Sequence, residues 1–558
     1  MARGVEAAAL VLAVVTLLAL RLVYLLHHRV DSDEPQHLHV VWGWTQGLVQ
    51  YRDFFDNHAP LFHLMMAPLF GRFGEREDIW LVARFWMLPL VGASLWAVYR
   101  IGSALWSKRV GAWGALLGGL APGFLLLSTE FRTDVLWMAS WLAALVVTLS
   151  GTLDRRRALV AGLLLGVALA ISLKTILLIL ALALAGGIVA LLLNVRGEPG
   201  ALAAARRVAP AWLAGMICVP GVILLVFWRL HALGDLYACT LKHNVVPGLG
   251  FWHSAPFRFL LFPAAALLLT AIAHRMIRAG EPTGLQSRRT VLALAVGFYL
   301  ALLIAFWPLI TEEDFLPSTP LLMLLLTAAV DAALAWVRHR RPRFDAIAWG
   351  MGIASLVVVL DVFAVNRMEP ALRDDSRTER QLLCDVVRLT RPGEPIMDLK
   401  GETIFRPRPC YYVLEGITKA RLAMGLLPDR IASDIVRTRT HFAVPDDRNF
   451  PPAARAFLNQ HFVGLGSLRV LGAEWARGPG AADSLLAFDV SYPERFGVLA
   501  DGAAAAGALD GTPYRGPLRV EPGRHTYRPR PGERRITVIW QGALDRGLMS
   551  ESNLAAAR

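Results

Sequence analysis

The sequence predicts a polytopic α-helical membrane protein with about eleven transmembrane helices, followed by a soluble C-terminal region. Three observations lead to this fold class. Of the 558 residues, 55% are hydrophobic and only 18% are charged, whereas a soluble domain carries about a quarter. The apolar residues gather in blocks of about 20 residues, the length that crosses the hydrocarbon core of a bilayer. After Val365 these blocks stop, and the remaining sequence resembles an ordinary globular region.

The apolar blocks are the predicted transmembrane helices. They run over Glu6–His28, Ile79–Arg100, Val110–Leu127, Val135–Ser150, Ala158–Leu173, Thr175–Leu193, Val208–Leu230, Phe257–Met276, Val291–Ile310, Leu316–Val337 and Ala346–Val365. The first block carries Arg21 near its far end, and no convincing small-residue cleavage site precedes the polar sequence that follows. We therefore expect a retained helix and not a removed signal peptide.

Cations are concentrated in alternate loops between the blocks. The basic loops hold Lys108 and Arg109, Arg155–Arg157, Arg206 and Arg207, Arg288 and Arg289, and Arg338–Arg343. Since cytoplasmic loops are enriched in Lys and Arg, we expect a multi-pass protein of the bacterial cytoplasmic (inner) membrane, with a cytoplasmic N-terminus and an extracytoplasmic C-terminal region. The net charge of +13 then reflects topology, and we expect no nucleic-acid partner.

Three domains are predicted along the chain. Residues 1–370 form the membrane domain, and residues 371–480 form an extracytoplasmic α/β domain that starts with a helix over Asp375–Leu389. Residues 481–558 form a β-rich module, because short β-prone runs such as Ile536–Gln541 alternate there with Gly, Pro and Asp turns.

Two cysteines fall in the predicted extracytoplasmic region. Cys384 and Cys410 lie on the oxidising side of the membrane in this topology and are able to pair. Two free buried thiols are an equally good interpretation, and spacing alone does not decide between them.

The first outer loop, residues 29–78, is long and is predicted to hold interfacial helices. It opens with Asp31-Ser32-Asp33-Glu34-Pro35 and continues through Tyr51-Arg52-Asp53-Phe54-Phe55-Asp56-Asn57-His58-Ala59-Pro60-Leu61. Simple solvation is one interpretation of such an acidic loop. However, its acids are interleaved with aromatic residues and proline, which favours a partly buried cleft. Carboxylates are costly there unless they are paired or catalytic.

Three further groups lie in the other outer loops. Arg132 and Asp134 occupy a very short loop, where they either pair with each other or serve a site. Lys174 lies between two apolar blocks, where it either holds a lipid phosphate or extends its side chain to the interface. Glu313 and Asp314 either coordinate a divalent cation, close the cleft, or form a solvated turn.

These motifs, in this order, resemble the GT-C superfamily of polyprenyl-phosphate-sugar-dependent glycosyltransferases. The nearest branches are the protein O-mannosyltransferases and the lipid A aminoarabinose transferases. The resemblance covers residues 1–370 and is carried by Asp33-Glu34, the long Tyr51–Leu61 motif, Arg132-Thr133-Asp134 and Lys174. The sequence departs from the family pattern at Pro35-Gln36-His37, and at Thr175, where many relatives have proline.

The resemblance implies a reaction and its partners. A sugar on a polyprenyl phosphate is the donor, and an acceptor hydroxyl on a protein, lipid or polysaccharide attacks the anomeric carbon with inversion. Asp33 takes the family position of the general base, with Glu34 or Asp31 as the alternative. Asp134 positions the acceptor or a metal ion, so the implied catalytic residues are Asp33, Glu34 and Asp134.

The resemblance also implies how the donor phosphate is held. Lys174 and Arg132 supply positive charge, alone or together with a divalent metal ion as a possible cofactor. The residues expected to line the cleft are Asp53, Asp56, His58, Glu313 and Asp314. Asp134, Glu313 and His58 are the weak candidates for metal ligands.

Two other classes of function remain open. A transporter or flippase of lipid-linked or polar cargo is the main alternative, but such proteins place ionisable residues near mid-membrane and often contain inverted repeats. Here the candidate residues lie at the outer boundary, and no repeat is visible. A non-catalytic scaffold whose C-terminal region binds a partner or a glycan is the third hypothesis.

Overall fold

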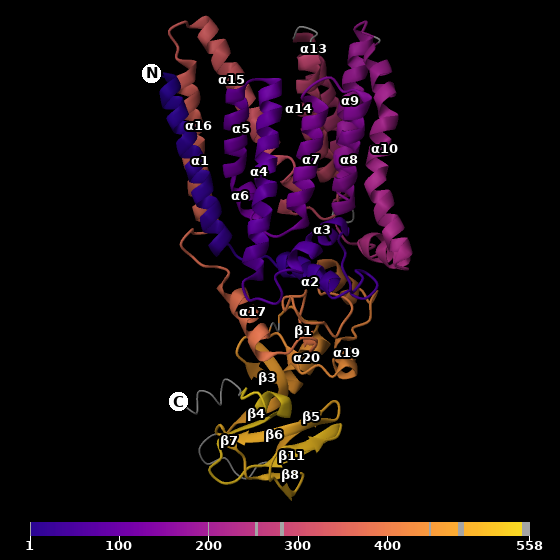
Figure 1. Ribbon diagram of the computed structural model, residues 1–558, viewed down its shortest axis with the longest axis vertical. Coiled ribbons are helices and arrows are strands. Elements are labelled where there is room, and N and C mark those ends of the chain that lie inside the picture. Colours follow the sequence, from indigo (N-terminus) through magenta and orange to yellow (C-terminus); the bar gives the residue numbers. More distant parts are fainter. Residues whose placement is uncertain are drawn as a thin grey trace. The chain divides into compact units, whose positions relative to one another are not determined.

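The computed structural model describes residues 2–198, 200–250, 255–279, 284–445, 448–477 and 485–548. It consists of two compact units (Figure 1). Unit 1 contains Met1–His37, Asn57–Met66 and Trp80–Ser376, and unit 2 contains Leu38–Asp56, Ala67–Ile79 and Arg377–Arg558. The predicted border between residues 480 and 481 lies outside the described residues.

Unit 1 is built from helices. Its main elements are α1 (Ala2–His27), α4 (Ile79–Leu105), α5 (Lys108–Leu120), α6 (Pro122–Leu127), α7 (Thr133–Leu149), α8 (Arg155–Ile171), α9 (Thr175–Val195), α10 (Gly200–Arg229), α11 (Leu233–Tyr237), α13 (Leu261–Ala279), α14 (Gly284–Phe306), α15 (Thr319–Arg340) and α16 (Ala346–Met368). Shorter turns of helix are η1 (Ala238–Lys242), η2 (Pro256–Leu260) and η3 (Glu312–Phe315). The helices α2 (Asp33–Thr45) and α3 (Leu61–Phe70) each begin in unit 1 and end in unit 2.

The predicted fold class, a polytopic α-helical membrane protein, is confirmed. Among the described residues, eight helices are long and apolar enough to cross a membrane: α1, α4, α9, α10, α13, α14, α15 and α16. The other predicted blocks coincide with α7, α8 and the broken pair α5–α6, which are shorter. The number of about eleven spans therefore stays a prediction.

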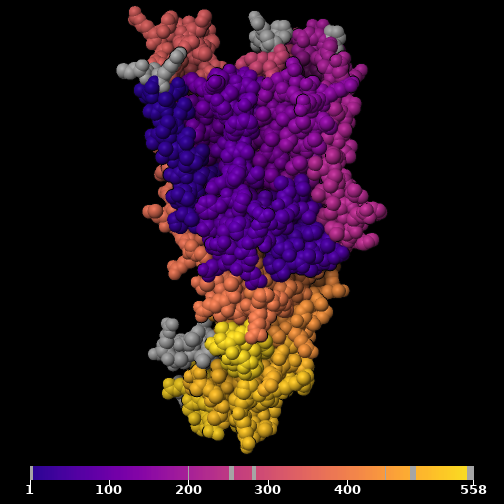
Figure 2. Space-filling model, in the orientation of Figure 1, coloured from indigo at the N-terminus to yellow at the C-terminus, as the bar shows by residue number. Residues whose placement is uncertain are grey.

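The outer surface of the bundle is apolar, as a lipid-facing surface must be. Large side chains such as Leu12 and Leu22 on α1, and Ile217 and Leu225 on α10, are more than half exposed. Figure 2 shows α1 in indigo and α10 in magenta along opposite flanks of unit 1. Hydrocarbon can cover these side chains at no cost, whereas water cannot.

Small residues allow helices of the bundle to approach closely. At Gly162 on α8, an added Cβ would lie 2.1 Å from the carbonyl oxygen of Trp212 on α10. At Gly215 on α10, it would lie 2.3 Å from the carbonyl oxygen of Leu159. Neither position therefore has room for a side chain. Without a hydrophobic force between helices in lipid, such close backbone packing stabilises their association.

The predicted outer loops of unit 1 lie together at one end of the bundle. The segments after α1, before α7, before α9 and between α14 and α15 contact one another through charged side chains. Arg109, from a basic loop, instead pairs with Glu6 near the start of α1. The acidic and basic loops thus lie at opposite ends, as the charge pattern predicts. Which end faces the cytoplasm stays a prediction.

Unit 2 combines helices with two sheets. Its helices are α17 (Arg377–Leu389), α18 (Gly416–Ala423), α19 (Ile431–Thr438), α20 (Pro452–His461) and α21 (Gln541–Leu544). Its strands are β1 (Ile396–Met397), β2 (Phe442–Ala443), β3 (Phe462–Leu465), β4 (Leu468–Ala476), β5 (Leu486–Val490), β6 (Glu494–Ala500), β7 (Ala503–Ala504), β8 (Ala508–Leu509), β9 (Thr512–Pro513), β10 (Leu518–Val520), β11 (Gly523–Arg528) and β12 (Arg535–Trp540).

One sheet joins the two predicted pieces of the C-terminal region. Its order is β1-β2-β4-β12-β6-β10, with β3 on β4 and β7 on β6, while β5-β11-β8-β9 form a second sheet. The antiparallel ladder of β4 and β12 pairs Trp475 with Ile536 across the predicted border. Separate modules at 371–480 and 481–558 stay a prediction, although their strands share this sheet. Cys384 and Cys410 are both free thiols.

Candidate functional site

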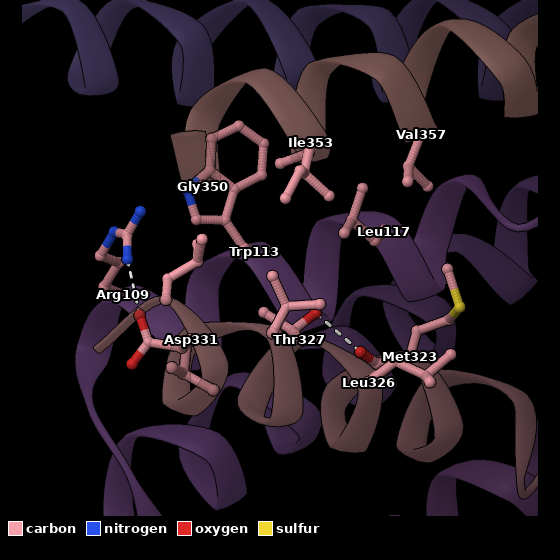
Figure 3. Close-up of a pocket in the computed structure, with 14 residues that line it drawn as sticks. Arg109, Trp113, Leu117, Met323, Leu326, Thr327, Asp331, Gly350, Ile353 and Val357 are labelled. Atoms are coloured by element: carbon pink, nitrogen blue, oxygen red, sulfur yellow. Dashed lines mark hydrogen bonds and ion pairs between the residues drawn. The ribbon is translucent and has the colours of Figure 1, made fainter. Parts of the chain in front are cut away.

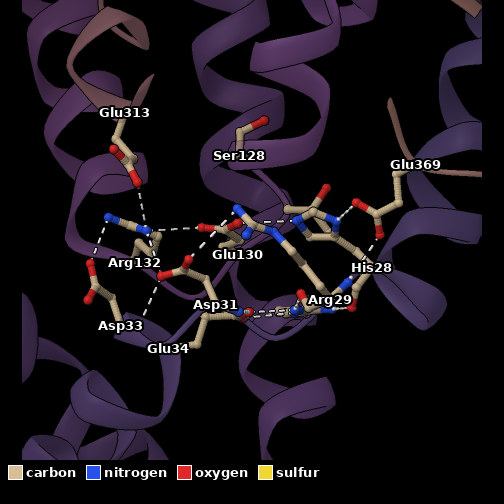
Figure 4. A network of polar contacts seen from close by, with 12 residues as sticks. His28, Arg29, Asp31, Asp33, Glu34, Ser128, Glu130, Arg132, Glu313 and Glu369 are labelled. Carbon is tan, nitrogen blue, oxygen red and sulfur yellow. Dashed lines mark hydrogen bonds and ion pairs between the residues drawn. The ribbon is translucent and has the colours of Figure 1, made fainter. Parts of the chain in front are cut away.

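Arg132 is the centre of a charged network at the acidic end of unit 1 (Figure 4). It directly precedes α7 in an extended conformation (φ −134°, ψ 154°), and its side chain is only 8% exposed. Its guanidinium forms ion pairs with Asp31 (3.0 Å), Asp33 (2.9 Å), Glu130 (3.3 Å), Asp134 (3.4 Å) and Glu313 (2.9 Å). Loops distant in sequence therefore converge on a single cation.

The charges in this network do not balance. Burial would lower the pKa of Arg132, but the surrounding carboxylates, led by Asp33, raise it well above its ordinary value. Burial raises the pKa of the Glu130 carboxyl, and neighbouring acids add to this effect. Arg132 therefore stays charged, and the excess of acids must be relieved by a proton or by another cation.

Glu34 is locked in place by Arg84 of α4. Both side chains are completely buried. The Arg84 guanidinium binds both carboxylate oxygens of Glu34, at 2.8 Å for Nε and Oε2, and also donates to the carbonyl oxygens of His28 and Arg29. The backbone N–H of Phe131 donates to Glu34 Oε2 at 2.9 Å. This bidentate, fully hydrogen-bonded pair fixes the start of α2 against α4.

Asp33, the neighbour of Glu34, has a different environment. It begins α2, and its side chain is 22% exposed. Its backbone N–H donates to Asp31 Oδ1 at 3.0 Å, and its Oδ2 faces one Arg132 nitrogen at 2.9 Å. Asp33 is thus a partly exposed carboxylate that is held by a cation.

A second chain of contacts runs from Glu130 to the end of α16. His28 Nε2 lies 3.1 Å from Glu130 Oε1, and His28 Nδ1 lies 2.6 Å from Glu369 Oε2. Burial would lower the pKa of His28, but the hydrogen bonds to these two carboxylates raise it. Through these two contacts, His28 links α1 and α16 to the network, and its protonation would add a second buried cation beside Arg132.

Lys174 lies directly before α9 and faces the same group of loops. Its Nζ contacts Asp314 Oδ1 and lies 4.0 Å from Asp134 Oδ1. Its ammonium is also 6.0 Å from the centroid of the Trp137 ring. Burial would lower the pKa of Lys174, but Asp134 and Asp314 raise it, so the side chain stays charged. Its side chain is 23% exposed, which leaves one side accessible.

The structure thus brings together many of the residues predicted from sequence. Within unit 1 it joins Asp33, Arg132, Asp134 and Glu313 in one network, with Lys174 and Asp314 as an ion pair beside Asp134. His58 also lies in unit 1, where its ring centroid is 4.6 Å from that of His37. Asp53 and Asp56 belong to unit 2, where Asp53 pairs with Arg52 and Asp56 accepts from Gln50.

The metal candidates do not form a ligand set. In the part of the chain that the structure describes, no group of three His, Cys, Asp or Glu side chains is arranged to hold a metal ion. Asp134 and Glu313 both face Arg132, while His58 packs on His37. Their oxygens are therefore directed at a cation that the chain itself supplies.

An apolar cavity occurs elsewhere in unit 1, between α5, α15 and α16 (Figure 3). Its volume is ≈ 260 Å³, and Trp113, Met323 and Ile353 are among its lining residues. Its charged members, Arg109 and Asp331, are paired with each other at 2.7 Å. The lining of this cavity suits a hydrocarbon chain, and its two charged side chains are occupied by each other.

Several members of the network were missed by reasoning from sequence. Arg84 had a usable signal, because a cation inside an apolar block is costly unless it is paired. Glu130 shares its short loop with Arg132, but the residue type alone does not reveal its contact with His28. Glu369 follows the last predicted span, and no local pattern connects it to His28, which lies 341 residues earlier.

Known structures share this fold. The crystal structure of ArnT from Cupriavidus metallidurans in the apo state aligns with a TM-score of 0.53 and 13% sequence identity, over 84% of this chain and 98% of that chain. The structure of the same protein bound to undecaprenyl phosphate aligns with a TM-score of 0.52 and 13% identity, over 82% and 97%. The fold that the resemblance implies is therefore confirmed.

More distant likenesses add nothing to this assignment. The archaeal oligosaccharyltransferase AglB from Archaeoglobus fulgidus aligns with a TM-score of 0.45 and 11% identity, over 82% of this chain and 74% of that chain. With a TM-score of only 0.45, this likeness carries no argument about the fold. No protein-family model and no curated protein matches the sequence.

Proposed function

We propose that the chain is a membrane glycosyltransferase that moves a sugar from a polyprenyl-phosphate donor to an acceptor hydroxyl, with inversion at the anomeric carbon. One observation carries this proposal: Asp33 lies within the same compact network as Arg132, with Lys174 beside Asp134. A base and two cations at one end of a helical bundle match the needs of this reaction. The ArnT fold, seen with undecaprenyl phosphate bound in that protein, supports the choice of donor.

Asp33 serves as the general base. The acceptor O–H gives its proton to the Asp33 carboxylate while its oxygen forms a bond to the anomeric carbon. The bond between that carbon and the phosphate oxygen breaks in the same step, and its electron pair leaves with the lipid phosphate. Arg132 orients Asp33 through their 2.9 Å ion pair. Glu34 is occupied by Arg84 on both oxygens, so we assign it a positioning role.

Lys174 and Arg132 stabilise the departing phosphate. Both cations keep their charge, because the surrounding carboxylates raise their pKa values. An ammonium at the edge of the bundle is a compact donor for phosphate oxygens, and fixed positive charge is most effective where negative charge develops during the reaction. Asp134 lies between these cations and positions them relative to each other.

A divalent metal ion stays a prediction for this site. Because the described residues offer no three-ligand group, no step of the proposed reaction is routed through a metal. Transfer by the purified protein after treatment with EDTA, with and without added Mg²⁺ or Mn²⁺, decides whether a metal is needed.

The site is proposed to face the outside of a bacterial inner membrane. The acidic loops lie at the end of the bundle opposite Arg109 and the other basic loops, and cytoplasmic loops are the basic ones. The acceptor is then an extracytoplasmic protein, lipid or polysaccharide.

The test is lipid and glycan analysis of a deletion strain. We expect a polyprenyl-phosphate sugar to accumulate and one glycan to be lost, with both reversed by a plasmid that carries the wild-type gene. A plasmid carrying Asp33→Asn should insert the protein normally but fail to restore the glycan. An unchanged pool of lipid-linked sugars in the deletion strain would contradict the proposal.

A further inference from the structure

We propose that unit 2 contains a binding site for an uncharged sugar, in a cavity formed by the first outer loop and the C-terminal region. The cavity has a volume of ≈ 270 Å³ and lies entirely within unit 2. Its lining comes from the C-terminal half of α2, residues 48–55, residues 407–413 and the end of α19. A cavity of this size accommodates a sugar ring but not a larger drug-sized ligand.

Aromatic rings provide the apolar surfaces of this cavity. Trp42, Phe54, Phe55 and Tyr411 all line it. Trp42 stacks on His39 with 5.3 Å between ring centroids, which fixes its position, and its side chain is only partly buried. Tyr411 is 37% exposed. The flat apolar face of a pyranose, made of C–H groups, packs on such rings, whereas its hydroxyl edge needs hydrogen-bond acceptors.

Asp53 provides the acceptor. Its Oδ1 accepts from Arg52 Nε at 2.9 Å, and its Oδ2 accepts from the backbone N–H of Val49 at 2.8 Å and from Arg52 Nη2 at 2.9 Å. The hydrogen bond from Arg52 lowers the pKa of Asp53, so the carboxyl is ionised. A carboxylate has about four acceptor sites, which leaves capacity for a sugar hydroxyl.

The cations around the cavity are already neutralised, which favours an uncharged ligand. Arg408 is almost completely buried, and it pairs with Asp398 and donates to the carbonyl oxygens of Leu399 and Tyr412. Arg437, on the rim, pairs with Asp434 at 3.1 Å. An anionic sugar or a phosphate would find no cation that lacks an acidic partner among these residues.

Two residues with strained backbone contact side chains that line the cavity. Tyr51 has φ 73° and Ile404 has φ 42°, a left-handed conformation that non-glycine residues rarely adopt. The Tyr411 hydroxyl donates to the carbonyl oxygen of Tyr51. His39 Nδ1 lies 2.8 Å from the carbonyl oxygen of Ile404. Such strain persists only where the surrounding structure fixes it, and it is concentrated at binding sites.

Saturation-transfer NMR on the full-length protein in detergent tests this site. The probes are methyl glycosides of glucose, mannose and galactose, without any lipid-linked donor, so the outcome does not depend on the proposed transfer reaction. We expect saturation transfer from the protein to the ring C–H protons of at least one glycoside. The Kd of this glycoside should be on the order of millimolar. Trp42→Leu and Asp53→Asn should each weaken binding at least tenfold, whereas Trp42→Phe, which keeps an aromatic face, should retain most of it.

The matched control is Trp336→Leu, because Trp336 lies on α15 and is 56% exposed, far along the chain from the lining residues. This variant should bind like the wild type. Absence of saturation transfer from all three glycosides would overturn the proposal. Equal binding of the glycosides by Trp42→Leu and the wild type would also overturn it. So would saturation transfer to a short peptide such as triglycine and not to the sugars.

Discussion

Two adjacent carboxylates, Asp33 and Glu34, are paired with two different arginines in opposite ways. The Glu34–Arg84 pair is completely buried and bidentate, and backbone groups complete its hydrogen bonding. In the Asp33–Arg132 pair, Asp33 Oδ2 lies 2.9 Å from an Arg132 nitrogen, 22% of the Asp33 side chain is exposed, and Arg132 is shared with four other carboxylates. The first pair fixes the fold at this point, and the second leaves a carboxylate available for chemistry.

This difference teaches that burial of the ion pair, and not position in a motif, separates a positioning carboxylate from a candidate base. A carboxylate with both oxygens bound by a guanidinium cannot accept a proton without losing a buried ion pair. A carboxylate that is partly exposed, as Asp33 is, can accept a proton without the loss of a completely buried ion pair.

The largest effect is expected for Glu34→Gln. It leaves the Arg84 guanidinium buried without its counter-charge, and breaking a buried pair in this way costs about 3–5 kcal/mol. Thermal unfolding in detergent should show a Tm lowered by roughly 10 °C or more. Glu312→Gln, at an exposed position in the same acidic cluster as Glu313, is the control and should unfold like the wild type. Equal stability of the Glu34 variant would show that this pair does not fix the fold.

Arg132→Lys should reduce transfer by about 10²–10³-fold, because an ammonium cannot reproduce the fork that contacts several carboxylates at once. The measurement is sugar transfer by the purified protein from a polyprenyl-phosphate sugar. Arg155→Lys, on an exposed residue at the start of α8, should leave the rate unchanged. A lysine variant with full activity would remove Arg132 from the mechanism.

Lys174→Met should lower transfer by about 10²-fold through kcat, since the lost charge stabilises the departing phosphate. Lys174→Arg keeps the charge and should recover part of the rate. The matched control, Lys108→Met, removes an exposed lysine at the start of α5. If Lys174→Met raised KM and left kcat unchanged, Lys174 would bind the donor without stabilising the transition state.

A smaller effect is expected from titration of His28. Because its folded-state pKa is raised, the stabilisation from its ion pairs is fully present below the unfolded value of about 6.5. That stabilisation is lost as the pH rises through the folded-state pKa. The Tm should therefore fall by a few degrees above neutral pH, and His28→Gln should remove this part of the pH dependence. An unchanged profile in the variant would exclude His28 as the titrating group.

The sequence was sufficient to predict the membrane bundle, since apolar blocks of spanning length leave few alternatives. It also placed Asp33, Arg132, Asp134 and Lys174 in loops at one end, because the charge pattern orients successive helices in alternation. It ranked Asp33 before Glu34 only through the family resemblance, and it showed no physical difference between the two. That distinction depends on Arg84, which reaches Glu34 from another helix 50 residues later.

The His28 contacts show a second limit of reasoning from sequence. Glu130 and Glu369 meet on opposite nitrogens of one imidazole, although they come from loops far apart in the chain. Hydropathy and charge patterns describe segments one at a time and carry no information on such pairings. The same holds for the unit 2 cavity, where the first outer loop and the C-terminal region line one space.

The central claim is tested most directly by transfer from a polyprenyl-phosphate sugar to the acceptor that the deletion strain identifies, measured for Asp33→Asn beside the wild type. We predict that the variant keeps the wild-type Tm to within about 2 °C and loses transfer by at least about 10³-fold. A folded Asp33→Asn variant that still transfers the sugar at a rate near that of the wild type would contradict the account.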